Sequence, residues 1–124
     1  MLFATDIVKI VTGYPTFLPV ENGQYPVYGE NIYSPIKGEV IKVENDIFDN
    51  QLYSGNYPYN TGNTVVIKND AYYLLLGHLK MQSIVVKEGD IVKTNDLIGC
   101  AGNSGWTERP HLHMQIIKSE TDTY

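Results

Sequence analysis

Residues 63–78 read NTVVIKNDAYYLLLGH, in which two apolar, β-branched or aromatic runs flank the pair Asn69-Asp70. Asn and Asp tolerate the left-handed backbone of a tight turn, so this stretch predicts a β-hairpin. Its second run is apolar or aromatic up to Gly77, and we therefore expect that strand to be buried on both faces. Further short apolar runs follow, separated by Gly89-Asp90 and Asn95-Asp96. Such dense turning predicts a small barrel or a folded-over antiparallel sheet.

Other segments of the chain also predict strands. Residues 3–11 (FATDIVKIV) are apolar and β-branched, and the turn residues Gly13-Tyr14-Pro15 follow them. Residues 38–44 (GEVIKVE) come close to strict alternation, and a last strand is expected after Pro110, over residues 111–117 (HLHMQII). Because no segment keeps a helical period over even ten residues, we predict an all-β fold with almost no helix.

The composition limits the classes of protein to consider. A chain of 124 residues fits a single domain, here 1–124, and 43% hydrophobic with 19% charged residues is ordinary for a folded domain. The net charge is −5 and the basic residues are scattered, so no nucleic-acid-binding surface is expected. The sequence has no apolar run long enough for a membrane span, and its first residues do not resemble a signal peptide. One cysteine, Cys100, excludes an intramolecular disulfide.

The last predicted strand carries the chemistry. In a strand His111, His113 and Gln115 share one face, while Leu112, Met114 and Ile116 share the other. A His-x-His pair on a strand matches the geometry of zinc sites, and an exposed, inert pair is the alternative. The third histidine of the chain, His78, ends the buried hairpin strand, where a sheet opens to solvent.

Two loops are candidates for the walls of a groove. Residues 45–62 form a long aromatic loop that includes Tyr57 and Tyr59, and loops of this length are usually functional. The alternative is that its tyrosines pack on the sheet. The second loop, residues 103–109, offers Asn103, Trp106 and Arg109 as substrate contacts, although a loop tryptophan can equally pack on its own sheet.

Several motifs together resemble the lysostaphin-type zinc metalloendopeptidases, which cleave peptide cross-links in bacterial cell walls. The matching stretches, in chain order, are YSPIKGEV (33–40), GNTVVI (62–67), GHL (77–79), VKEGDIVKTNDLIG (86–99), GNSG (102–105) and PHLH (110–113). The resemblance implies a barrel-sandwich hybrid fold, a zinc ion and His113 as one of its ligands. It also implies that His111 and His78 are catalytic, one as general base and the other stabilising the oxyanion. The implied partners are stem or cross-link peptides of peptidoglycan, in a location outside the cell or facing the cell wall.

In one respect the sequence departs from the family. The other two zinc ligands of the family are an early histidine and an aspartate about four residues later. Asp6 fits the aspartate position, but Met1 and Leu2 precede it and no histidine occurs before His78. With only Asp6 and His113, we expect zinc to bind weakly or with partial occupancy, and activity to be poor. Three explanations stay open: an upstream histidine cut off from this sequence, a degenerate family member, or another donor such as the terminal amine.

Other functions were weighed against this resemblance. A non-catalytic module of the same fold would bind peptidoglycan or a protein partner in the same groove. A phosphocarrier domain also uses two histidines, but lacks the GNSG and PHLH motifs. A biotinyl or lipoyl carrier is suggested by residues 86–99 (VKEGDIVKTNDLIG). Such a domain is modified on a lysine within its hairpin turn, and no lysine occupies that position here. The last alternative is a thiol hydrolase in which Cys100 pairs with His78. The opposing interpretation is that Cys100 is only a small residue of the core.

Overall fold

A computed structural model describes residues 3–9, 21–55 and 57–118 of the chain, and these residues form an all-β structure. The helical structure in these ranges is confined to two short 3-10 turns, η1 (Asn22–Gln24) and η2 (Tyr57–Tyr59). The predicted all-β class with almost no helix is therefore confirmed. The strands are β1 (Phe3–Ile7), β2 (Asn31–Tyr33), β3 (Gly38–Glu44), β4 (Asn63–Lys68), β5 (Tyr73–Leu79), β6 (Ile91–Val92), β7 (Leu97–Cys100) and β8 (Leu112–Ile117).

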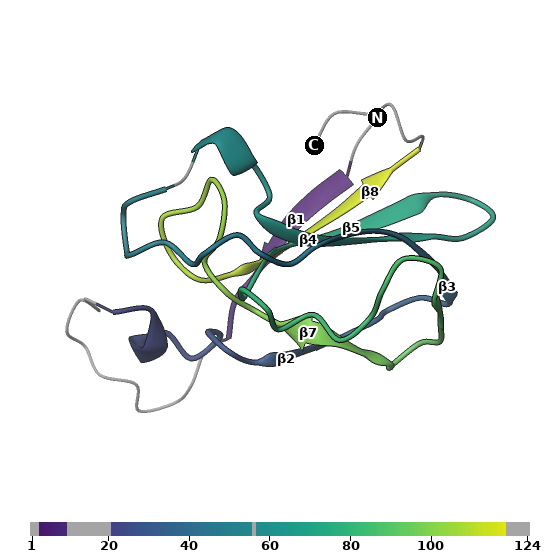
Figure 1. Cartoon of the computed structure of the whole chain (residues 1–124), viewed down its shortest axis with the longest axis horizontal. Helices are drawn as coiled ribbons and strands as arrows, with labels where there is room; N and C mark the ends of the chain where they lie inside the picture. Colours follow the sequence, from purple (N-terminus) through teal and green to yellow (C-terminus); the bar gives the residue numbers. More distant parts are fainter. Residues whose placement is uncertain (1–2, 10–20, 56, 119–124) are drawn as a thin grey trace.

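The strands pair into two antiparallel sheets. The larger sheet has six strands in the order β1-β8-β5-β4-β3-β6, and the smaller sheet pairs β2 with β7. In Figure 1, β1, β8 and β5 lie side by side, and β2 and β7 run below them. This order pairs β1 with β8, strands from the two ends of the chain, and β8 in turn with the central hairpin strand β5.

The hairpin of β4 and β5 is the centre of the fold, as the sequence predicted. Its turn is closed by Asn69, whose Oδ1 accepts hydrogen bonds from the backbone N–H groups of Ala71 and Tyr72. All residues of β5 after Tyr73 are buried. One side of the large sheet packs into the core together with Ile98 of β7. The core residues of the large sheet are Val40, Val65, Ile67, Leu74, Leu76, Leu79, Val92 and Leu112.

Strand limits differ from the expectation at both outer strands. The strand predicted over residues 3–11 ends at Ile7, and its last two residues lie outside the described part of the chain. The last strand begins at Leu112 rather than at His111. Among the helical segments that the structure describes, none has the length and apolar character needed to cross a bilayer.

Candidate active site

Strands β1 and β8 bring an aspartate next to the His-x-His pair. In the antiparallel register Asp6 lies directly opposite His113, and Gly77 of β5 lies opposite His113 on its other side. Leu112 belongs to the hydrophobic core and Met114 and Ile116 pack against it. The alternation predicted for this strand is therefore confirmed, and the imidazole of His113 projects from the side of the sheet opposite the core.

His78 reaches the same place through an irregularity in β5. In a regular strand His78 would follow Leu74 and Leu76 onto the core side. The register between β4 and β5 shifts between Asn63 and Val65, and His78 has a left-handed backbone with φ of 58°. An extra residue in one strand re-aims the side chains around it. Here the bulge turns the imidazole of His78 toward β8 and returns Leu79 to the core.

The three histidines come from two segments that are distant in the sequence, and they meet in one cluster. Each contributes one ring nitrogen to a group in which all such atoms lie within 4.8 Å of one another. The ring centroid of His78 is 4.7 Å from that of His111 and 5.7 Å from that of His113. Asp6 joins the cluster, because its Oδ1 lies 2.9 Å from Nδ1 of His113 and 3.5 Å from Nε2 of His111.

In each of the three imidazoles one ring nitrogen lies at hydrogen-bond distance from an oxygen acceptor. His78 Nδ1 lies 2.7 Å from the carbonyl oxygen of Ser104, and His111 Nδ1 lies 2.9 Å from that of Arg109. His113 Nε2 lies 2.9 Å from the amide oxygen Oε1 of Gln115. Carbonyl and amide oxygens only accept hydrogen bonds, so each of these nitrogens carries the proton in the neutral ring.

These contacts fix the direction of the remaining lone pairs. In the neutral tautomers the unprotonated atoms are Nε2 of His78, Nε2 of His111 and Nδ1 of His113. In this tautomer Nδ1 of His113 and the carboxylate of Asp6, 2.9 Å apart, are both acceptors, and a metal ion bound by both atoms would satisfy them. Tetrahedral zinc ligands at about 2.0–2.1 Å lie roughly 3.3 Å apart, close to the two Asp6 distances above. The donor set therefore fits a divalent metal ion.

Burial changes the acid–base behaviour of His78. The residue is 5% exposed, and this burial is the main reason why its pKa is lowered from 6.5 to about 4. The hydrogen bond to Ser104 and the charge of Asp6 oppose the shift, while His111 and His113 add to it. At neutral pH His78 is consequently an uncharged ring with a lone pair available to accept a proton.

The two predicted wall loops pack against each other beside the histidines. Asn50 is buried, and its Nδ2 donates to the carbonyl oxygens of Asn103 and Gly105 at 2.9 and 2.7 Å. The backbone N–H of Trp106 donates to the carbonyl oxygen of Asn60 at 2.7 Å. The same pairing of loops carries Ser104, which orients His78, so loop packing and histidine geometry are linked.

The predicted substrate contacts fall into three groups. Tyr59 and Trp106 are 51% and 59% exposed, and Arg109 is also exposed. Asn103 is fully buried, with Nδ2 donating to Oδ1 of Asn22 at 3.0 Å. This burial corrects the expected substrate contact, because Asn103 supports the loop from behind. The side chain of Tyr57 lies outside the described residues.

Sequence reasoning missed several residues that orient the histidines. Ser104 belongs to the quoted GNSG motif, but its carbonyl contact with His78 depends on the fold. Gln115 was placed on the correct face by strand alternation, without a role. Thr61, whose carbonyl oxygen accepts the backbone N–H of His78 at 2.6 Å, carries no signal in the sequence. The thiol of Cys100 contacts Oδ1 of Asn31 at 3.6 Å. Among the described residues, no contact links this thiol to His78.

Comparison with known proteins agrees with this geometry. The sequence profile of peptidase family M23 matches residues 24–123. The chain belongs to peptidase family M23. Among relatives, it is 40% identical over 99 residues to the peptidoglycan DD-endopeptidase ShyA of Vibrio cholerae, covering 80% of this chain and 22% of that protein. It is 29% identical over 100 residues to an uncharacterized metalloprotease of Buchnera aphidicola, covering 81% of this chain and 25% of that protein. The M23 chain thus spans about a quarter of the length of these two relatives.

Solved structures agree with this assignment to family M23. A zinc-containing peptidase from Vibrio cholerae is 31% identical with a TM-score of 0.57, over 77% of this chain and 25% of that one. A mutant of the catalytic domain of the prophage-encoded M23 protein EnpA from Enterococcus faecalis has a TM-score of 0.61 at 23% identity. That match covers 95% of this chain and 82% of that one. At such low identity the second likeness concerns the fold alone.

Proposed function

We propose that this M23 domain is a zinc-dependent endopeptidase that hydrolyses peptide cross-links of the bacterial cell wall. One observation carries the proposal: the carboxylate of Asp6 and the unprotonated nitrogens of three histidines converge on the side of the sheet opposite the core. The relatives' names, a peptidoglycan endopeptidase and a zinc-containing peptidase, support the choice of substrate and metal. A location facing the cell wall follows from this substrate.

In the proposed site Asp6 and His113 would hold the metal. These are two protein ligands where a catalytic zinc usually has three, so we expect weak zinc binding and low activity of the chain as given. Asp6 and His113 are the two acceptors at 2.9 Å, and Gln115 keeps Nδ1 of His113 unprotonated for this purpose. Zinc, when bound, supplies Lewis acidity that lowers the pKa of water from 15.7 to about 7 and polarises a carbonyl group. The remaining steps belong to side chains of the chain itself.

His78 is proposed as the general base. Its Nε2 is unprotonated at neutral pH, and its Nδ1–H donates to the carbonyl oxygen of Ser104. Its ring lies next to both other imidazoles. It can accept the proton of the attacking water and pass it to the leaving amine. His111, once protonated at Nε2, can donate to the oxyanion formed at the scissile carbonyl, since Arg109 holds its other nitrogen in place.

The test measures zinc content and release of peptides from purified peptidoglycan on the same protein samples. Asp6→Asn and His113→Ala should lose both zinc and peptide release. His78→Gln should keep zinc and lose release by roughly a hundredfold or more, typical of general acid–base catalysis. The matched control is Asp70→Asn, which removes an exposed carboxylate at the far hairpin turn and should change neither quantity.

Two results would overturn the proposal. One is peptide release that survives Asp6→Asn and chelator treatment, which would exclude a metal at this site. The other is an unmodified chain that binds peptidoglycan with zinc present and releases no peptide, which would favour the non-catalytic binding module instead.

A further inference from the structure

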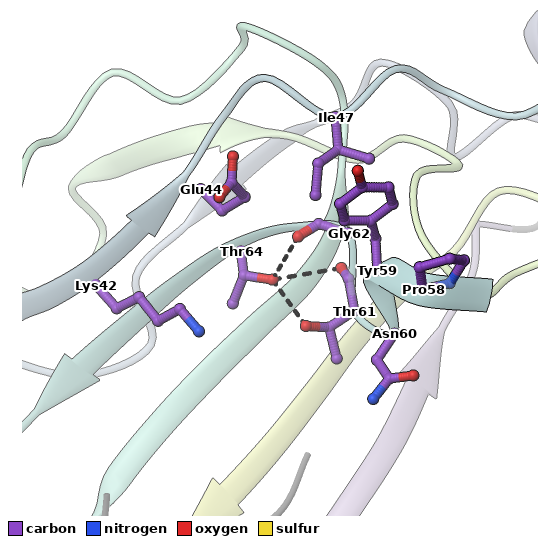
Figure 2. Close-up of a pocket in the computed structure, with 9 residues that line it drawn as sticks. All are labelled: Lys42, Glu44, Ile47, Pro58, Tyr59, Asn60, Thr61, Gly62 and Thr64. Atoms are coloured by element: carbon purple, nitrogen blue, oxygen red, sulfur yellow. Dashed lines mark hydrogen bonds between the residues drawn. The ribbon is translucent and has the colours of Figure 1, made fainter. Parts of the chain in front are cut away.

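A hollow lies on the large sheet (Figure 2). It has a volume of about 250 Å³ and is bounded by the ends of β3 and β4 and by residues 58–62. Binding pockets for whole small molecules usually start at roughly 300 Å³, so this hollow suits one side chain of a larger ligand. Its lining includes Lys42, Glu44, Ile47, Tyr59 and Thr61.

Strand register places this hollow on the same face of the sheet as the histidines. Gln115 of β8 lies opposite Leu75 of β5, Leu75 opposite Val66 of β4, and Val66 opposite Lys42 of β3. Directly paired residues share a face, and Glu44 follows Lys42 on that face. Two to three strand spacings separate β8 from the hollow, about 10–14 Å, which an extended peptide covers in roughly three to four residues.

The hollow and the histidine cluster share a wall. Thr61 accepts the backbone N–H of His78 through its carbonyl oxygen at 2.6 Å. Its hydroxyl lies 2.8 Å from that of Thr64, at the floor of the hollow, as Figure 2 shows. A peptide that lies over His78 would therefore pass Thr61 to enter the hollow.

The hollow offers a carboxylate and an aromatic ring to its occupant. Glu44 is half-buried, and within the described residues no hydrogen bond or ion pair occupies its carboxylate. A second hollow of about 220 Å³ adjoins the first, shares Glu44, Ile47 and Tyr59 with it, and adds Asp46. The two carboxylates outnumber the single ammonium group of Lys42 in this region. The ring of Tyr59, half exposed between the hollows, can stack against a cation.

We propose that this hollow is a substrate subsite for a peptide residue whose side chain carries a primary ammonium group, held by Glu44 and the ring of Tyr59. The proposal rests on the peptidase function above. It places the ammonium-bearing residue about three to four positions from the cleaved bond.

Binding of defined peptides tests the subsite without relying on cleavage. The probes are acetylated, amidated glycine–alanine heptapeptides with one lysine three or four residues from the central bond, on either side. Their partners carry norleucine, which has the same chain without the charge. We expect the best lysine peptide to bind the full chain about five- to tenfold more tightly than its norleucine partner, by calorimetry at pH 7.

Variants locate the effect. Glu44→Gln should abolish the preference for lysine, and Tyr59→Phe, which keeps the ring, should retain most of it. The matched control is Glu39→Gln, an exposed carboxylate at the other end of β3, which should leave the preference unchanged. Equal affinity for lysine and norleucine peptides, absence of binding, or a preference that survives Glu44→Gln would each overturn the subsite.

Cleavage of the same peptides with zinc present keeps the two proposals apart. A chain that cleaves both peptide types equally and binds them equally retains the peptidase function and loses the subsite. A chain that prefers lysine through Glu44 and cleaves nothing retains the subsite as a binding feature and loses the peptidase function.

Discussion

Replacing Gln115 by leucine tests whether the tautomer of His113 prepares the metal site. Gln115 is 6% exposed, and its Oε1 is the acceptor that holds the Nε2–H of His113 at 2.9 Å. Leucine removes this acceptor, so the proton is no longer confined to Nε2 and Nδ1 is no longer kept free for a metal. Loss of such an orienting partner typically lowers metal affinity 10- to 100-fold, about 1.4–2.7 kcal/mol.

The assay is a zinc titration against a competing chelator on the purified chain, Gln115→Leu and Gln115→Glu. Glutamate keeps an acceptor at the same distance along the side chain and should preserve most of the affinity. Heteronuclear NMR of the imidazole nitrogens in metal-free protein should show Nε2 of His113 protonated and hydrogen-bonded in the unmodified chain, and the loss of that hydrogen bond in the leucine variant. A leucine variant that binds zinc within twofold of the unmodified chain, with an unchanged Nε2–H signal of His113, would refute this role of Gln115.

Three further predictions concern the support of the site. Gly62→Ala should lower the free energy of unfolding by about 3 kcal/mol or more, because φ is +60° there and a Cβ would overlap Ser104. The measurement is chemical denaturation, and the control is Gly23→Ala, where a Cβ meets open space. In chelator-treated protein, acidification from pH 6.5 to 4 should lower the free energy of unfolding of the unmodified chain by about 3 kcal/mol more than that of His78→Gln. The reason is that His78 binds a proton in the unfolded chain over this range, whereas in the folded chain its pKa is lowered to about 4. Asn50→Ala should cost about 1–3 kcal/mol and accelerate hydrogen exchange in residues 103–107, since their carbonyl groups lose a buried donor.

The sequence was sufficient for the elements whose side-chain pattern is local. The hairpin of residues 63–79 followed from two apolar runs around Asn69-Asp70, and the two faces of β8 followed from the alternation between His111 and Ile116. The limits of β1 were less certain, because its apolar run continues past the residues that pair with β8. Asn103 was misplaced because the motif containing it gave no information on which way its side chain turns.

What the sequence by itself determined is the class of fold and the chemistry of the strand after Pro110, since both depend on residue type and a period of two. The family resemblance already placed His78 in the site, and only the tertiary structure shows how its side chain reaches the other histidines. Strand alternation would send it to the core, and a bulge with a left-handed backbone, held by Thr61 and Ser104 from other segments, turns it back to the histidines. Likewise, only the pairing of β1 with β8 places Asp6 opposite His113, because a contact between residues 107 positions apart depends on the fold rather than on local sequence.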